Sequence, residues 1–461
     1  MTQSAGESHY HVAPAFPDFW LALRFWLKLG FISFGGPAGQ IAIMHQELVE
    51  KRRWISEQRF LHALNYCMLL PGPEAQQLAT YIGWLLHGVR GGVVAGVLFM
   101  LPSLLLLIAL SWLYIAYGQT SLVAGLFYGI KPAVTAIVLQ AAHRIGGRTL
   151  KNASLWTIAV AAFIAIFALD LPFPLIVLCA AVVGYLGGRF VPQHFHAAGG
   201  HNSNTTQTKQ VSYGVAVIDD QTPTPSHARF SWAGLSRVLL VGVLLWALPM
   251  LSLIWLFGWQ HTLTQMAWFF TKAAFMTFGG AYAVLPYVMQ AAVHHYGWLT
   301  AGQMIDGLAL GETTPGPLIM VLAFVGFVTA YVQALFGADQ LFLAGAVAAI
   351  LVTWFTFLPS FIFILAGGPL IESTHNQISF TAPLSAITAA VVGVIVNLTL
   401  FFAYHVLWPQ GFTADFVSSF DPWAAGIAVL AAIALIRLKW NVMWVIALAA
   451  LAGLLIRFFA G

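Results

Sequence analysis

The sequence has 461 residues, of which 60% are hydrophobic and only 7% are Asp, Glu, Lys or Arg. Soluble domains carry about 25% charged residues, so this composition excludes a water-soluble globular protein. The formal net charge of +4 is attributed to cytoplasmic loops and predicts no nucleic-acid partner. Cys67 and Cys179 both lie in apolar surroundings and predict no disulfide framework.

Long apolar runs recur along the chain after a polar N-terminal tail, residues 1–17, which lacks the pattern of a cleaved signal peptide. Four of these runs span residues 93–117, 235–257, 341–366 and 441–459. Each is near or above the roughly 20 residues that a helix needs to cross a bilayer. None alternates as a transmembrane strand would. The predicted fold class is therefore an all-α polytopic membrane protein.

A motif in the first half of the chain recurs 244 residues later. Lys28-Leu-Gly-Phe-Ile-Ser-Phe-Gly-Gly36 corresponds to Lys272-Ala-Ala-Phe-Met-Thr-Phe-Gly-Gly280. At the same spacing, and without a gap, Pro71-Gly72-Pro73 corresponds to Pro315-Gly316-Pro317. At a slightly larger spacing, Leu101-Pro-Ser103 resembles Leu358-Pro-Ser360. The chain is therefore predicted to be a duplicated unit.

The duplication divides the chain into five parts. They are the polar tail (1–17), a first transporter repeat (18–190), a polar cytoplasmic linker (191–232), an unpaired transmembrane helix (233–258) and a second repeat (262–461). The linker is rich in Asn, Thr and Gln and is expected to be solvated and disordered. Its histidines are too irregularly spaced to predict a metal site.

The unpaired helix inverts the second repeat relative to the first if each repeat crosses the membrane an even number of times, a common transporter plan. Loop charge agrees with inversion. Residues 45–59 contain four Lys or Arg, whereas the equivalent residues 289–303 contain none. Because cytoplasmic loops are enriched in Lys and Arg, the equivalent loops are predicted to lie on opposite sides of the membrane.

Two segments of each repeat are predicted to be broken helices. Residues 20–44 contain Gly35-Gly36-Pro37, and residues 60–88 contain Pro71-Gly72-Pro73 near their middle. If both segments enter the membrane and return as re-entrant hairpins, the basic loops share one side and the chain has nine spans plus four hairpins. The alternative is thirteen complete, kinked spans, which keeps the inversion but places residues 45–59 outside.

Such breaks free backbone groups that cost several kcal/mol each in lipid, so they survive only where protein or a wet cavity surrounds them. A break also creates a helix N-terminus with unpaired N–H groups, which favours an anion near the bilayer midplane. The residues expected to bind it lie at or near the breaks: Lys28, Ser33, Gly35, Gly36, Asn65, Pro71, Gly72, Pro73, Gln76, Gln77, Lys272, Thr277, Gly279, Gly280, Thr313, Thr314 and Gly316. The alternatives are breaks that only pack, and lysines that extend to the membrane surface.

Three carboxylates interrupt the symmetry of the repeat and are predicted to couple transport to protons. Glu74 corresponds to Leu318, while Glu312 and Asp306 correspond to Met68 and His62. The alternatives are that Glu74 satisfies first-turn N–H groups and that Asp306 is interfacial.

The sequence around the breaks resembles the chromate ion transporter (CHR) family in its long two-domain bacterial form. The resemblance rests on the stretches 29–42 and 70–83, on Phe278-Gly-Gly280 and on Thr314-Pro-Gly-Pro317. It covers both repeats. The second repeat departs from the first because it lacks the Pro after Gly280 and the Glu after Pro317.

The resemblance implies a secondary transporter that exports chromate from the cytoplasm and is driven by the proton motive force. It places the chain in the bacterial inner (plasma) membrane as a multi-pass protein, with chromate or a sulfate-like oxyanion and the lipid bilayer as partners. A homodimer is left open. Transport of sulfate or another tetrahedral oxyanion, and an anion channel, remain the alternatives.

The sequence gives little support to other classes of function. No Walker Gly-Lys-Ser/Thr segment is present, and His45-Gln46-Glu47 lacks the second His of a zinc-protease helix. The sequence therefore predicts no enzyme, no cofactor and no metal.

Overall fold

The computed structural model describes residues 14–195, 213–223, 225–373, 381–411 and 419–460. Within these ranges all regular secondary structure is helical, and the helices are joined by loops, one of which forms an isolated β-bridge between Ile55 and Ile218. The prediction of an all-α membrane protein is confirmed.

The first half of the chain forms the helices α1 to α8. They are α1 (Phe19–Ile32), α2 (Gly36–His45), the π-helix η1 (Gln46–Lys51), α3 (Glu57–Leu69), α4 (Glu74–Tyr117), α5 (Ser121–Thr149), α6 (Ala153–Phe167), α7 (Phe173–Phe190) and α8 (Pro192–Phe195). Helix α4 has non-helical backbone angles at His87 and Gly88, so it consists of a short arm before this kink and a long arm after it.

A single long helix, α9 (Trp232–Phe257), follows the 3-10 turn η2 (Ser226–Ala228) and separates the two halves. The second half is again helical. It comprises α10 (Thr262–Phe275), α11 (Ala281–Met289), the π-helix η3 (Gln290–His295), α12 (Ala301–Thr313), η4 (Leu318–Met320), α13 (Val321–Val332), η5 (Ala338–Gln340), α14 (Leu341–Ser373), α15 (Thr381–Leu407), α16 (Pro422–Ile436) and α17 (Val442–Ala460).

Elements of the two halves start at equivalent positions. Helices α3 and α12 start at residues 57 and 301, a separation of 244, and the π-helices η1 and η3 are related in the same way. Ser56 and Thr300 precede α3 and α12, and each accepts a hydrogen bond from the N–H three residues later. Hydroxyl N-caps of this kind fix where a helix begins, so the same local signals produce the same element twice.

The helices are interrupted where the Gly and Pro motifs predict. Pro73 is the N-cap residue of α4 and Pro317 is the N-cap residue of η4. A helix start tolerates Pro because its missing N–H would have had no partner there. The interruptions lie at residues 33–35, 70–73, 276–280 and 314–317.

Among the described residues, seven helices are long and apolar enough to cross a membrane, namely α4, α5, α7, α9, α14, α15 and α17. Helices α6 and α16 and the segment formed by η4 and α13 are apolar but shorter. The apolar surface that these helices expose is what a lipid environment requires. The chain is therefore a multi-pass membrane protein.

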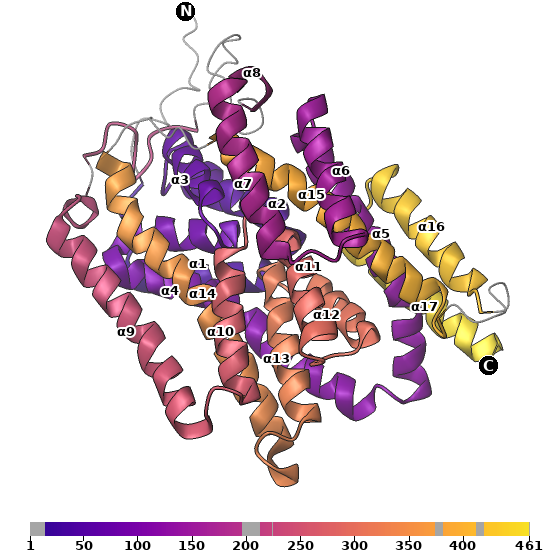
Figure 1. Ribbon diagram of the computed structural model, residues 1–461. Helices are drawn as coiled ribbons and strands as arrows, with labels where there is room; N and C mark the ends of the chain where they lie inside the picture. The colour runs from indigo at the N-terminus through magenta and orange to yellow at the C-terminus, as the bar shows by residue number, and fades with distance from the viewer. Residues whose placement is uncertain (1–13, 196–212, 224, 374–380, 412–418, 461) are drawn as a thin grey trace, which may run out of the picture.

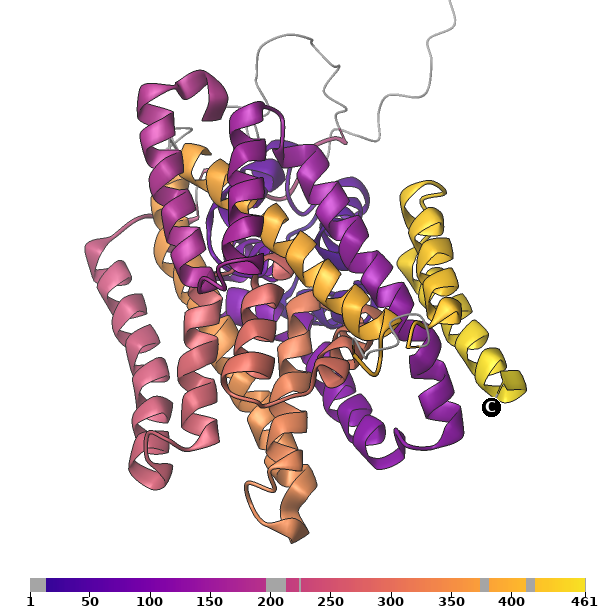
Figure 2. The ribbon, with the colours of Figure 1, turned by 45° about the vertical axis from the view of Figure 1, so that its right-hand side comes forward.

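The pictures show how the helices are arranged. Helix α9 lies at one edge of the molecule and α16 and α17 lie at the other (Figures 1 and 2). Helix α7 ends beside α8 near the top of Figure 1, whereas α17, its counterpart in the second half, ends near the lower right. The two final helices of the halves thus run in opposite directions.

Part of the linker differs from its prediction. Residues 213–223, expected to be solvated, pack on the loop after η1, and the following turn η2 contacts α4 and α14. Val217 and Ile218 donate backbone hydrogen bonds to the carbonyls of Arg53 and Trp54, at 2.9 and 3.1 Å, and Ile218 is buried. The expectation of disorder is wrong here because an apolar run, Val215 to Ile218, finds a partner strand segment. Residues 196–212, with His196 and His201, lie outside the described residues.

Candidate functional site

The four interruptions meet through two reciprocal backbone hydrogen bonds. The N–H of Gly72 donates to the carbonyl of Thr277 at 2.7 Å, and the N–H of Gly316 donates to the carbonyl of Ser33 at 2.8 Å. Gly72 is equivalent to Gly316, and Ser33 is equivalent to Thr277. Each half of the chain therefore satisfies a backbone donor of the other half, and the interruptions form one centre.

Glycine is required at both donor positions. Gly72 and Gly316 have φ of +129° and +102°, a region that L side chains rarely adopt. A Cβ on Gly72 would meet the hydroxyl of Ser360, and one on Gly316 would come within 2.8 Å of the Cβ of Ser103. The sequence pairs these two serines, since each follows a Leu-Pro in its own half. The long arm of α4 and the helix α14 thus close the centre from both sides.

Amide side chains of the first half line the centre. Gln40 of α2 donates to the carbonyl of Gly316, on the other half of the chain. Gln77 of α4 donates to the carbonyl of Pro71 at 2.8 Å and to the hydroxyl of Ser360 at 3.4 Å. Gln77 was predicted as a site residue, whereas Gln40, Ser103 and Ser360 were not. The repeated Leu-Pro-Ser was the signal for the two serines.

Several buried polar atoms at the centre have no hydrogen-bond partner within the described part of the chain. They are Ser33 Oγ, Ser103 Oγ, Gln76 Oε1 and Gln77 Oε1. All four residues are 0% exposed. A buried polar atom without a partner costs about 1–3 kcal/mol, so such a cluster is expected where a ligand or water completes the bonding.

Other predicted residues are held by local bonds near the centre. Gln76 donates to the hydroxyl of Thr80 at 3.0 Å, and the hydroxyls of Thr313 and Thr314 donate to carbonyls of their own helix. Gly35, Gly36, Gly279 and Gly280 all have positive φ and shape the turns that precede α2 and α11.

Three predicted residues are not part of the buried polar cluster. Lys28 and Asn65 are exposed. Lys272 is half-buried, with its ammonium 5.8 Å from the centroid of the Trp268 ring, a cation–π distance. Neither lysine side chain forms a hydrogen bond or an ion pair with the interruptions within the described part of the chain.

The three predicted coupling carboxylates occupy different places. Glu74 begins α4, and Arg148 of α5 lies within electrostatic range of it. Glu312, near the end of α12, accepts a hydrogen bond from Tyr282 and faces Arg144 of α5. Glu74 and Glu312 therefore flank the interruptions that follow α3 and α12. Asp306 lies farther along α12.

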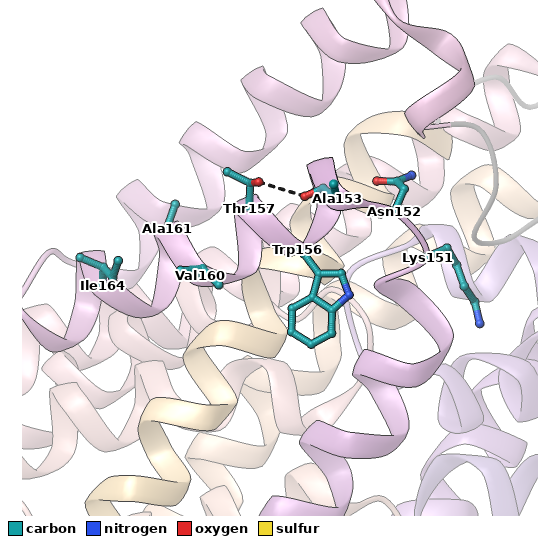
Figure 3. A pocket seen from close by; sticks show the side chains of 8 residues that line it. All are labelled: Lys151, Asn152, Ala153, Trp156, Thr157, Val160, Ala161 and Ile164. Carbon is teal, nitrogen blue, oxygen red and sulfur yellow. Dashed lines mark hydrogen bonds between the residues drawn. The ribbon is translucent and has the colours of Figure 1, made fainter.

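A cavity of about 310 Å³ adjoins the centre. It is lined by both halves of the chain, namely by Tyr66, Leu69, Phe278, Ile371, Pro383, Leu384 and Ile387. A larger hollow of about 830 Å³ lies along α6, between Lys151 and Ile164. Figure 3 shows that its lining comes from α6 and the residues just before it. Because Trp156 and Ile164 there are about half exposed, this hollow is an outer surface groove rather than a substrate site.

The described residues contain no group of three or more His, Cys, Asp or Glu side chains that could hold a metal ion. The centre instead offers hydroxyls, amides and helix starts, which suit an anion. With its long apolar helices and interruptions at the centre, the chain has the architecture of a membrane transporter.

Comparison with known proteins agrees with this class. The family model described as "Chromate transporter" matches residues 20–185 and 264–454, one segment in each half. The chain belongs to the chromate transporter family, and is thus a transporter rather than an enzyme.

Named relatives extend over most of the chain. A "Chromate transport protein" of Pseudomonas aeruginosa is 35% identical over 93% of this chain and 90% of its own length. A "Probable chromate transport protein" of Synechococcus elongatus is 28% identical over 93% and 97%, respectively. A "Chromate transport protein" of Cupriavidus metallidurans is 27% identical over 87% and 86%. No solved structure matches the chain.

We predict that Gly72→Ala destabilises the protein. The left-handed backbone alone costs roughly 1–3 kcal/mol with a side chain, and the added Cβ also meets Ser360. The measurement is the thermal unfolding midpoint of the purified protein in detergent. Gly147→Ala is the matched control, because a Cβ there meets nothing within 4 Å and Ala is favoured in helices by about 0.5–1 kcal/mol. Equal midpoints for the two variants would contradict the tight closure of the centre.

Proposed function

We propose that this protein is a secondary transporter that exports chromate from the cytoplasm and is coupled to the proton motive force. The observation that carries the proposal is the reciprocal pairing of Gly72 with Thr277 and of Gly316 with Ser33. It gathers two helix starts and a set of buried, unpartnered polar atoms into one centre. Family membership and the names of the relatives support chromate as the substrate.

The centre suits a tetrahedral dianion for electrostatic reasons. The starts of α4 and of the η4–α13 segment lie directly after the paired glycines, and helix starts present N–H groups and positive dipole ends. The hydroxyls of Ser33 and Ser103 can donate to oxyanion oxygens. We assign substrate contact to these buried groups first, and Lys28, which is exposed, remains a candidate for guiding the anion toward them.

We propose that the two repeats, 18–190 and 262–461, have inverted topology. Support comes from the opposite directions of α7 and α17 (Figure 1) and from the basic loop 45–59, whose counterpart has no Lys or Arg. In the described residues, four interrupted segments and nine further long or apolar helices fit the arrangement of hairpins plus spans. Under this topology residues 45–59 are cytoplasmic, and the protein lies in the inner membrane.

Glu74 and Glu312 are our choice for proton coupling. Both flank the centre, and the arginines Arg148 and Arg144 of α5 lie within electrostatic range of them. An anion entering the centre competes with these carboxylates for the same positive charges. In an exporter driven by inward-moving protons, the anion and the proton are carried in different halves of the cycle, so we assign to these carboxylates the proton that returns after the anion has left.

We predict that loss of an unpartnered hydroxyl weakens substrate binding without destabilising the fold. Ser103→Ala removes an oxygen that has no hydrogen-bond partner in the described part of the chain, so the unfolding midpoint should stay the same or rise. A hydrogen bond to a charged group is worth about 1.5–3 kcal/mol, so the KM for chromate uptake should rise roughly tenfold or more. Ser111→Ala is the control, since Ser111 Oγ is also buried and unpartnered but lies two turns from Ser103. An equal KM in the two variants would show that Ser103 does not contact the substrate.

Transport itself is tested in everted membrane vesicles with radiolabelled chromate. We expect saturable uptake that an uncoupler abolishes. Glu312→Gln should lower energised uptake by about tenfold or more, the effect of losing about 1.4 kcal/mol, and should leave the residual flux insensitive to the uncoupler. Glu50→Gln is the control, because Glu50 is an exposed carboxylate of the π-helix η1 and Gln can keep its contact with His45.

Other outcomes separate the alternatives. Uptake of sulfate without uptake of chromate keeps the carrier and changes its substrate. Non-saturable flux that persists with the uncoupler indicates an anion channel. If neither anion moves in vesicles of verified orientation, the proposed function is refuted.

A further inference from the structure

A buried ion cluster joins the start of α3 to the end of α14. Arg59 donates to Glu372 at 3.2 Å, and the hydroxyl of Tyr81, on the short arm of α4, donates to the other oxygen of Glu372 at 2.6 Å. The Glu372 side chain is 7% exposed and that of Arg59 is 14% exposed. We call these three residues the first latch. It ties an interrupted element of the first half to the long helix of the second half.

A second cluster of the same kind joins α12 to the end of α4. Lys131 of α5 lies 3.3 Å from Asp306, and the hydroxyl of Tyr114 donates to Asp306 at 2.8 Å. The Asp306 side chain is 5% exposed, whereas that of Lys131 is 33% exposed. These three residues form the second latch. It ties an interrupted element of the second half to the long helix of the first half.

The two latches lie at opposite ends of the molecule. Tyr114 lies 11 residues after Ser103, and Glu372 lies 12 residues after Ser360. In a helix each separation corresponds to roughly 17 Å from the centre. Figure 1 shows α14 ending near the top of the view, while α4 turns into α5 near the bottom. One latch therefore closes each side of the centre.

The composition of the latches favours a contact that opens. A buried ion pair contributes little net stability because its desolvation cost offsets its attraction. In both latches the cation is more exposed than the carboxylate, so separation of the helices returns the charges to water. In the closed form a tyrosine hydroxyl donates to each carboxylate, and Oδ1 of Asp306 in the second latch stays buried without a partner in the described part of the chain. Such a cluster holds two states at similar free energy, which a packed apolar contact does not.

We propose that the first and second latches are alternating gates, each of which opens one side of the anion centre while the other stays closed. This inference rests on the proposed transport function, since it explains how the centre reaches each side. Both latches are closed in this structure. Opening moves α3 away from α14, or α12 away from α4, by rocking one half against the other.

The linker adds a brace to the first latch alone. Arg59 donates through Nη2 to the carbonyl of Thr222 at 2.6 Å, and Ser56 donates to Asp220. The position equivalent to Arg59 is Gln303, which makes a capping bond at the start of α12 instead. The linker between the repeats is therefore joined to one gate, and this contact biases the protein toward closure of that side.

The test uses thiol labelling of the full-length protein in membrane vesicles with a maleimide. Cys67 is buried on α3, between the first latch and the interruption at 70–73, and reports opening of the first latch. Leu310→Cys places a thiol on α12 between Asp306 and the interruption at 314–317, and reports opening of the second. Cys179→Ser removes the exposed native thiol, and Cys67→Ser accompanies the α12 reporter.

Glu372→Gln should raise labelling of Cys67 about fivefold or more and lower labelling at position 310, because it shifts a two-state population toward opening on the first side. Asp306→Asn should produce the opposite pair of changes. Tyr81→Phe and Tyr114→Phe should give smaller changes in the same directions, and they test the proposal if the charge variants fail to fold. The exchange of Arg59→Glu with Glu372→Arg should restore the parent pattern.

Lys51→Gln is the matched control, because it breaks the exposed ion pair with Glu47 at 2.7 Å and should change neither reporter. Labelling that rises or falls together at both reporters, or that does not change, overturns the alternating gates. This readout needs no substrate. If the variants shift the two reporters in opposite directions but the parent protein moves no chromate, the gates are retained and the proposed function is refuted. If the parent protein transports chromate but the variants cause no such shifts, the proposed function is retained and the gates are refuted.

Discussion

The structure depends on a shortage of backbone partners inside a membrane. Each interruption removes helical hydrogen bonds at a depth where an unpaired N–H costs several kcal/mol. Gly72 and Gly316 resolve this by donating to the carbonyls of Thr277 and Ser33 in the opposite half. Each half thus supplies the acceptor that the glycine of the other half needs, and the centre is where the two halves of the chain are joined.

Close approach at the centre determines the packing around it. Because Gly72 and Gly316 have no side chains, the serines of the two long helices, Ser360 and Ser103, can lie against the paired backbones. A proline precedes each serine, and Pro102 also packs over Gly30 of α1. Small residues at such crossings let backbones approach in membrane proteins, where apolar attraction between helices is weak. The long arm of α4 and the helix α14 therefore both cover the centre and extend from it to the membrane surfaces.

Local sequence signals predicted where the helices are interrupted, whereas long-range contacts determine which residues meet at the interruptions. Interruptions at Gly and Pro were predictable because those residues act on their own backbone, and the 244-residue repeat predicted that they would occur twice. The partner of Gly72 was not predictable, because Thr277 is distant in sequence and the bond carries no side-chain signature. For Lys28 the apolar surroundings suggested burial, yet its position on α1 faces outward. The apolar run from Val215 to Ile218 favoured an extended, packed segment, but the polar residues on both sides of it led to the prediction of disorder.

The near-symmetry of the centre has an energetic consequence for transport. When equivalent contacts hold the two sides, states open to either side have similar free energies, and a carrier needs such a balance because a ligand can shift only a modest gap. The departures from symmetry make the two sides of the centre chemically different. In the sequence repeat Glu74 corresponds to Leu318 and Arg59 corresponds to Gln303. Among the described residues, the linker contacts the first latch only. A duplicated frame thus keeps the two states near balance, and under the proposed function the proton motive force, acting through charges that only one repeat carries, drives the anion in one direction.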